Sequence, residues 1–184
     1  MTLRDLKVDH SWTLFLDRDG VINRRIVDGY VKSWEELGFL PGAKESFRTF
    51  SQRFGTIVIV SNQQGVGKGL MTSAEVEHIH TRMKEEIIVA GGRADAFYFA
   101  PQLAGEHSIM RKPGIGMALK ARRDFPQIRF RYSLMVGDSI SDMKFGKRAG
   151  MVTVLIADHP HLARKYPDLI DFRCTGLEDL AGQL

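Results

Sequence analysis

Residues 12–23 read WTLFLDRDGVIN, and this stretch decides the fold class. A short apolar run, Trp12–Leu16, ends directly at two carboxylates, Asp17 and Asp19, with Gly20 close behind. Such runs are typical of strands that are buried in a parallel sheet. We therefore expect a strand whose carboxyl end carries acidic side chains, which is where open α/β sheets bind their ligands.

Further apolar runs follow the first one and alternate with stretches that have helical patterns. The other expected strands are Thr56–Val60, Ala96–Phe99, Leu134–Val136 and Val152–Ile156. The expected helices are Lys44–Arg53, a segment from Thr72 towards Gly91, Gly116–Phe125, Asp142–Ala149 and a short one from Leu177. This alternation predicts a single domain over residues 1–184, with a three-layer, Rossmann-like parallel sheet covered by helices on both faces.

The composition of the 184 residues fits one globular domain with a net charge of +4. The charge favours anionic partners, and it suits both a phosphorylated metabolite and nucleic acid. The single cysteine, Cys174, excludes an intramolecular disulfide and a multi-cysteine metal site. No stretch resembles a signal peptide or reaches membrane-spanning length. We expect a cytoplasmic monomer with no membrane partner.

Polar side chains follow three of the expected strands. Asp17 and Asp19 follow the first strand, Ser61 and Asn62 the second, and Asp138 the fourth. Because the carboxyl ends of parallel strands meet at the same edge of a sheet, we expect these side chains to form one site.

The residue types in these clusters suit phosphoryl transfer. A carboxylate at Asp17 can attack phosphorus, and the carboxylate of Asp19 can protonate the leaving oxygen and later activate water. Neighbouring carboxylates repel each other, so the site needs positive charge. Lys112, in the segment RKPG, can supply one charge, and Mg²⁺ bound by oxygen ligands such as Asp138 can supply the rest.

Each motif alone also has an ordinary structural explanation. The two aspartates fit a turn after a strand, and Ser61–Gly69, SNQQGVGKG, fits a flexible glycine loop. Arg111–Gly114 fits a solvated helix start, and Asp142 fits an acidic residue in the first turn of a helix. Gly67 and Lys68 do not belong to a P-loop, because the glycine and the hydroxyl residue of that motif are missing. The combination of motifs favours catalysis.

Together the motifs resemble, in order, the four motifs of the haloacid dehalogenase (HAD) superfamily of phosphatases, and the resemblance runs from Phe15 to about Gly150. It implies a HAD-like fold in which Asp17 is the nucleophile and Asp19 the general acid and base. It also implies that Mg²⁺ is bound by the carboxylates of Asp17 and Asp138 and by the backbone carbonyl of Asp19.

The same resemblance assigns the remaining candidates. The residues expected to bind the phosphate or the substrate are Ser61, Asn62, Arg111 and Lys112. Asp142 is expected to support the metal site. The segments Arg18–Pro41 and Ala100–Pro113 are too short for a cap domain, so we expect an open site without one.

Within the superfamily the chain resembles the branch of heptose bisphosphate phosphatases and histidinol phosphatases, through DRDGVIN, GYV at residues 29–31, NQQGVGKG and RKPGIGM. That branch usually has a zinc loop before the RKP segment. Here Ala100–Met110 has no cysteine and only His107, so we expect no structural zinc. Ser139 also stands where the branch usually has a lysine. The expected substrate is a small phosphosugar such as a heptose bisphosphate, or histidinol phosphate.

Two other functions remain open from the sequence. The NQxGxG(K/R)G and RKP elements also resemble polynucleotide 3′-phosphatases, so a nucleic-acid end is an alternative substrate. A non-catalytic phosphate-binding scaffold is the third hypothesis. Arg24, Arg25 and Lys68 are candidates for binding a second anionic group, although each also fits a plain surface cation. His159 and His161 fit a solvated loop.

Overall fold

The computed structural model describes residues 2–157 and 161–184, and its centre is a six-stranded parallel sheet with the strand order β3-β2-β1-β4-β5-β6. The strands are β1 (Thr13–Leu16), β2 (Thr56–Asn62), β3 (Ala96–Ala100), β4 (Ser133–Gly137), β5 (Val152–Ile156) and β6 (Phe172–Cys174). The predicted α/β class with a parallel sheet is confirmed.

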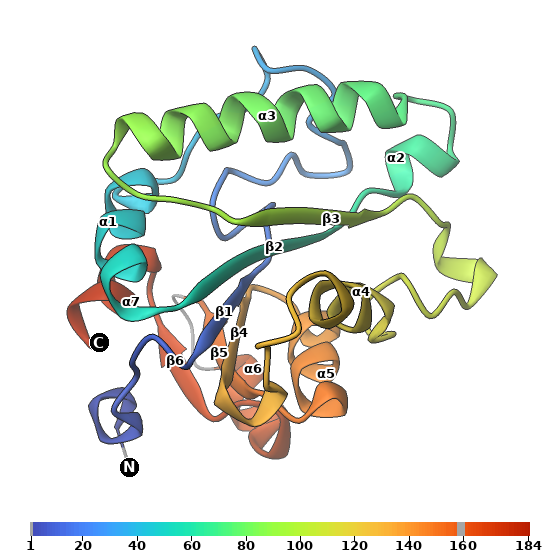
Figure 1. Ribbon diagram of the computed structural model, residues 1–184. Helices are drawn as coiled ribbons and strands as arrows, with labels where there is room; N and C mark the ends of the chain where they lie inside the picture. Colours follow the sequence, from blue (N-terminus) through green and yellow to red (C-terminus); the bar gives the residue numbers. More distant parts are fainter. Residues whose placement is uncertain (1, 158–160) are drawn as a thin grey trace.

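Helices cover both faces of the sheet (Figure 1). The helices on one face are α1 (Ala43–Arg53), α3 (Ser73–Val89) and α7 (Leu177–Gly182), and those on the other are α4 (Gly116–Asp124) and α5 (Ile140–Ala149). The short helices α2 (Gln64–Gly67) and α6 (His161–Lys165) follow β2 and β5 in the chain. Single 3-10 turns lie at Leu3–Leu6, Ala104–Glu106, Phe130–Tyr132 and Pro167–Leu169.

The central strands are buried on both faces because successive side chains point to opposite sides of a sheet. Leu14 and Leu16 belong to the cluster that includes Phe47 and Phe50 of α1. Between them, Phe15 faces the other layer, where its ring packs edge-on against Phe145 of α5 with the ring centroids 6.4 Å apart. This two-sided packing fixes the carboxyl ends of β1, β2 and β4, where the polar clusters lie.

Several boundaries differ from the sequence-based expectation. Ser61 and Asn62 are the last two residues of β2, where they pair with β3, and do not follow the strand. Strand β6 and helices α2 and α6 were not predicted. His161 is the exposed first residue of α6 and not part of a loop, and His159 lies outside the described residues. The predicted start of α3 is confirmed, since Thr72 Oγ1 accepts a hydrogen bond from the backbone N–H of Glu75.

No separate cap domain forms in the described part of the chain, as predicted. Between β1 and α1, residues 17–42 contain only the isolated bridges Asp19–Asn23 and Asn23–Phe39. Between β3 and α4 the chain forms one 3-10 turn. Among the described residues, every helix is too short or too polar to cross a lipid bilayer.

Candidate active site

The carboxyl ends of β1 and β2 open into a cavity of about 660 Å³. The predicted site residues that line it are Asp17, Asp19, Ser61, Asn62, Arg111, Lys112 and Asp142. Asp138, which follows β4, completes the group, because a carboxylate oxygen from each of Asp17, Asp138 and Asp142 lies within 4.8 Å of the others. The fold therefore brings all eight predicted site residues together.

The innermost part of the site is an ammonium group between two carboxylates. Lys112 is 3% exposed, and its Nζ lies 2.8 Å from Asp17 Oδ1 and 2.7 Å from Asp142 Oδ1. The same Nζ donates to the backbone carbonyl of Val60, at 2.8 Å. These three partners match the three donors of an ammonium group, so Lys112 is held in one position.

Burial dominates the electrostatics of this trio. Burial and the negative charge of Asp142 together raise the pKa of Asp17 to about 7, against the opposing charge of Lys112. Burial alone would lower the pKa of Lys112, but the adjacent carboxylates of Asp142 and Asp17 raise it, so the lysine stays charged. One lysine therefore does not fully compensate the carboxylates, and Asp17 needs more positive charge nearby to ionise completely at neutral pH.

Asp142 is fixed by the cap of α5. Ser139 is the N-cap residue, and its Oγ and backbone N–H donate to Asp142 Oδ2, at 2.6 and 3.1 Å. The other oxygen, Oδ1, lies against Lys112. Ser139 stands where the related branch usually has a lysine. Here it orients the carboxylate of Asp142, and that carboxylate in turn orients Lys112. Both oxygens of Asp142 are occupied, so this residue acts through Lys112.

Asp19 is held by three neighbouring side chains. Its Oδ1 accepts from Arg18 Nη2 at 3.0 Å and from Asn23 Nδ2 at 2.9 Å, and its Oδ2 accepts from Gln63 Nε2 at 2.8 Å. Burial acts to raise the pKa of Asp19, but the charge of Arg18 and these hydrogen bonds outweigh it and lower the pKa. The Asp19 carboxylate is therefore ionised and oriented before any substrate arrives.

Two further residues support Asp19: Arg18 contacts it directly, and His80 lies behind Arg18. Neither was predicted from the sequence. The Arg18 side chain is fully buried, and its Nη1 lies 3.5 Å from Nε2 of His80, whose ring stacks on Phe97 with the centroids 5.0 Å apart. Burial and the charge of Arg18 together lower the pKa of His80 to about 3. The imidazole is thus neutral, which avoids repulsion with the buried guanidinium. The position of Arg18 between the two aspartates of the DRD motif is the sequence feature that could have indicated its role.

Ser61 and Asn62 differ in their contacts. Ser61 Oγ accepts from Gln63 Nε2 at 2.6 Å, which leaves the hydroxyl proton available for a phosphoryl oxygen. The Asn62 amide instead bonds to the backbone of Lys112 in both directions, at 2.9 and 3.0 Å. Asn62 thereby anchors the segment that carries Lys112. Gln63, which links Ser61 to Asp19, was also missed from the sequence.

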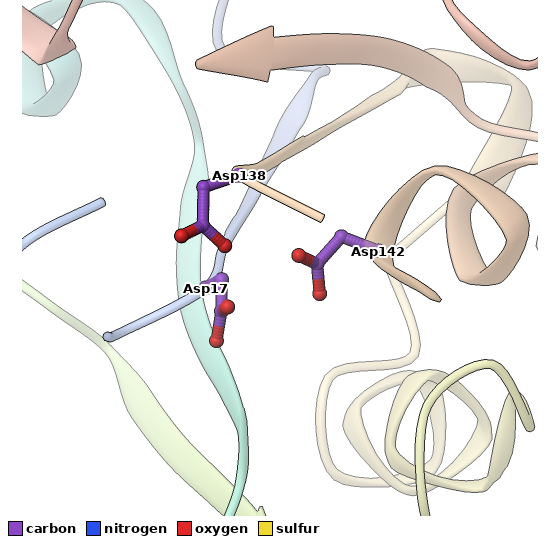
Figure 2. Close-up of side chains that lie close together, drawn as sticks. All are labelled: Asp17, Asp138 and Asp142. Carbon is purple, nitrogen blue, oxygen red and sulfur yellow. The ribbon is translucent and has the colours of Figure 1, made fainter. Parts of the chain in front are cut away.

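The acidic group fits a magnesium ion. Figure 2 shows the carboxylates of Asp17, Asp138 and Asp142 converging from the ends of β1 and β4 and the start of α5. Burial raises the pKa of Asp138 to about 6, against the opposing charge of Arg25. Gly20, at φ +89°, lets this carboxylate approach, since a Cβ there would lie 1.9 Å from Asp138 Oδ2. Three carboxylates this close together suit Mg²⁺, which prefers oxygen ligands.

Cations and an aromatic ring form the outer wall of the cavity, which we define as Arg25, Tyr30, Lys68 and Arg111. Lys68 Nζ lies 5.4 Å from the centre of the Tyr30 ring. Arg111 Nη1 donates to the backbone carbonyl of Gln102 at 3.2 Å, and burial lowers its pKa. Arg25 Nη2 lies 2.7 Å from Asp138 Oδ1. Arg24, the remaining candidate, is not among the residues that line the cavity.

Comparisons with known proteins establish the family. A family model described as HAD-hydrolase-like matches residues 109–178. A D-glycero-alpha-D-manno-heptose-1,7-bisphosphate 7-phosphatase of Mycobacterium bovis is 39% identical over 138 residues, which cover 75% of this chain and 73% of that protein. The chain belongs to the HAD superfamily of phosphatases. Like its relatives, this HAD phosphatase is a phosphate monoester hydrolase.

Other relatives agree with the heptose branch. A D-glycero-beta-D-manno-heptose-1,7-bisphosphate 7-phosphatase of Rhodopseudomonas palustris is 35% identical over 147 residues, covering 74% of this chain and 78% of that protein. The crystal structure of D,D-heptose 1,7-bisphosphate phosphatase from B. bronchiseptica, complexed with magnesium and phosphate, has a TM-score of 0.81 and 29% identity. That match covers 94% of this HAD phosphatase and 97% of the other chain.

Proposed function

We propose that this HAD phosphatase hydrolyses the 7-phosphate of a D-glycero-D-manno-heptose 1,7-bisphosphate, using Mg²⁺ and an aspartyl-phosphate on Asp17. The observation that carries the proposal is the pairing of the buried Asp17 with the fixed ammonium of Lys112, at the floor of a cavity with a cationic wall. The names of the relatives supply the sugar. We expect the enzyme to act as a cytoplasmic monomer.

The metal would be held by the carboxylates of Asp17 and Asp138 and by the backbone carbonyl of Asp19. When bound, Mg²⁺ supplies the positive charge that lets Asp17 ionise and neutralises the incoming phosphate. Ser61 offers its hydroxyl proton to a phosphoryl oxygen, and the charge of Lys112 beside Asp17 neutralises the phosphoryl group. Asp142 and Asn62 hold Lys112 in place.

The chemistry proceeds in two displacements at phosphorus. An Asp17 oxygen forms a bond to phosphorus while the bond to the sugar oxygen breaks, and a protonated Asp19 gives its proton to that oxygen. Asp19 is ionised in the free site, and the negative charge of the phosphate raises its pKa on binding. The Asp19 carboxylate then takes a proton from water, whose oxygen attacks phosphorus and releases Asp17 and inorganic phosphate.

The outer wall would bind the part of the substrate that is not cleaved. Arg111 and Lys68 place guanidinium and ammonium groups around the cavity, which suits a second phosphate on the sugar. The cavity of about 660 Å³ has the size of a small-molecule site. The relatives include phosphatases named for the alpha anomer and for the beta anomer, so both anomers are candidate substrates.

A comparison of kcat/KM across phosphate monoesters tests the substrate. The panel contains both heptose 1,7-bisphosphate anomers, histidinol phosphate, a DNA 3′-phosphate and p-nitrophenyl phosphate, each with Mg²⁺ and with chelator. We expect the highest kcat/KM for a heptose bisphosphate and loss of turnover in chelator that added Mg²⁺ reverses. A higher kcat/KM for the DNA 3′-phosphate would assign the chain to nucleic-acid ends, which the basic charge also suits.

The absence of structural zinc stays a prediction. The segment 100–110 forms one 3-10 turn at Ala104–Glu106, and His107 beside it is exposed. A structural zinc ion usually has four cysteine or histidine ligands, and this segment offers one. Elemental analysis of the purified protein should find no stoichiometric zinc. One tightly bound zinc per chain would contradict the prediction.

A further inference from the structure

The guanidinium of Arg25 contacts two oxygens that the proposed function assigns to the metal. Arg25 Nη2 lies 2.7 Å from Asp138 Oδ1 and donates to the backbone carbonyl of Asp19 at 3.2 Å. Arg25 comes from the segment after β1, and its side chain is 51% exposed, whereas the Asp138 side chain is 19% exposed. A solvent-accessible cation thus reaches into the acidic group and bonds to it.

The contacts of Arg25 use the same two oxygens that the metal would need, so the guanidinium and the metal would compete for them. Oδ2 of Asp138 lies against Gly20, only 1.9 Å from the position where a Cβ would be. Oδ1 is the oxygen that Arg25 occupies. A dication bound to Oδ1 and to the Asp19 carbonyl would stand at the place of the guanidinium nitrogen. Like charges at this separation repel, so one of the two cations has to leave.

The side chain of Arg25 has another place available. Arg25 already lines the cavity, together with Ile26–Tyr30 from the same segment. An arginine side chain that leaves Asp138 could therefore remain at the wall of this cavity, which Lys68 and Arg111 also line. There its guanidinium can pair with an anionic group of the substrate.

We propose that Arg25 is an internal competitor of Mg²⁺: it occupies Asp138 and the Asp19 carbonyl without metal, and metal binding releases it to the outer wall of the cavity. The inference rests on the proposed function, because it takes the metal ligands from there. Bound metal would free Arg25 for the substrate, and a substrate that pairs with Arg25 would free the metal site. Each ligand would therefore raise the affinity for the other by the same factor. Without metal, the positive charge of Arg25 would balance part of the negative charge of the carboxylates.

Direct metal binding tests this inference without measuring turnover. Isothermal titration calorimetry with Mg²⁺, and Mn²⁺ binding followed by electron paramagnetic resonance, give the Kd of chelator-treated protein. We compare the wild type with Arg25→Gln and with the matched control Arg24→Gln, which removes the same charge from the neighbouring residue. Asp138→Asn should lose most of the binding. Circular dichroism checks that each variant folds.

Arg25→Gln should bind the metal about three- to fivefold more tightly, which is the upper part of the range for a partly exposed ion pair. Arg24→Gln should stay within about twofold of the wild type, because Arg24 is exposed and has no ion pair with another described residue, so its charge is screened. Equal affinity of Arg25→Gln and the wild type would overturn the inference and leave the metal site standing. Equal tightening by both variants would also overturn it, since overall charge would then explain the effect. If no variant bound metal, both the inference and the proposed cofactor would be wrong.

Discussion

The inner and outer halves of the site are built differently. The inner half consists of the buried residues Asp17, Lys112 and Asp142, in which Lys112 pairs with both carboxylates at 2.7 to 2.8 Å. The outer half is the outer wall of the cavity. There the side chain of Arg25 is 51% exposed, and Arg111 contacts a backbone carbonyl through one guanidinium nitrogen. Each inner group is held by several partners, while each outer cation keeps donors free for a ligand.

This difference separates two tasks. The phosphoryl group is the same in every substrate of such an enzyme, so the groups that handle it can be fixed in advance. The rest of the substrate varies, and it meets side chains from loops that can be exchanged without disturbing the sheet. Substitutions in the inner half should therefore change turnover of every substrate, and substitutions in the outer half should change the choice among substrates.

The largest expected effect is that of Asp17→Asn. We expect kcat to fall at least about 10³-fold for all substrates, because an amide is a poor nucleophile for phosphorus. The variant should be at least as stable as the wild type without metal, since it removes a buried charge that faces Asp142 and Asp138. Thermal unfolding and single-turnover kinetics measure both properties. Asp168→Asn, on the exposed surface, is the control. A near-normal kcat would exclude the covalent mechanism.

The next effect is that of Lys112→Met, which leaves two buried carboxylates without their cation. We expect a loss of about 3–5 kcal/mol in the free energy of unfolding at neutral pH, together with loss of turnover. The exposed Lys144→Met is the matched control. The double variant Lys112→Met/Asp142→Asn should regain part of the stability and none of the turnover. If it regained turnover, Lys112 would serve the fold and not the reaction.

Substitution in the outer half should change selectivity. Arg111→Ala should lower kcat/KM for the best bisphosphate by about tenfold, the scale of a charge-assisted hydrogen bond, and change it little for p-nitrophenyl phosphate. Arg53→Ala, at the end of α1 before β2 begins, is the control far from the cavity. An equal loss for both substrates would show that Arg111 acts on the phosphoryl group, as the inner half does, and not on the choice of substrate.

The smallest expected effect concerns pH. Asp17 and Asp138 have pKa values raised to about 7 and about 6, so their protonation stabilises the folded state. This contribution to the free energy of unfolding is complete below about pH 4, the pKa of an aspartate in the unfolded chain. This contribution is lost as the pH rises through 6 to 7. Mg²⁺ binds the ionised carboxylates, so its effect should have the opposite pH dependence.

At 100 times its Kd, Mg²⁺ should raise the Tm by about 5–10 °C at pH 8 and by less at pH 5. Differential scanning calorimetry with and without the metal at both pH values measures this. Asp138→Asn should lose most of the increase at pH 8. A larger increase at pH 5 than at pH 8 would contradict the raised pKa values.

The sequence predicts the central strands and the inner site because apolar runs and the residues after them are local signals. It does not predict β6, a three-residue edge strand in which Arg173 is exposed and breaks the apolar run. It does not predict α2, since two of its four residues are glycines. The polar end of β2 was also missed, because Ser61 and Asn62 are strand residues only through their pairing with β3.

The supporting residues of the site depend on contacts between distant segments. Arg18 and His80 lie 62 positions apart in the chain, and Gln63 reaches Asp19 across 44 positions. No spacing rule connects such pairs in a single sequence. Asn62 lines the cavity, and its amide also bonds to the backbone of Lys112, a contact that only the folded arrangement reveals.

Gly20 has a consequence for natural variants of this protein. Any other residue at this position would place a carbon atom 1.9 Å from an oxygen of Asp138, at a backbone φ of +89° that side chains rarely adopt. The three atoms nearest to such a carbon all belong to Asp138, so the clash would be with this carboxylate and not with the hydrophobic core. A missense allele at codon 20 should therefore yield a folded protein that no longer binds its cation properly, and among homologous genes the loss of this glycine would mark copies that have abandoned metal-dependent catalysis.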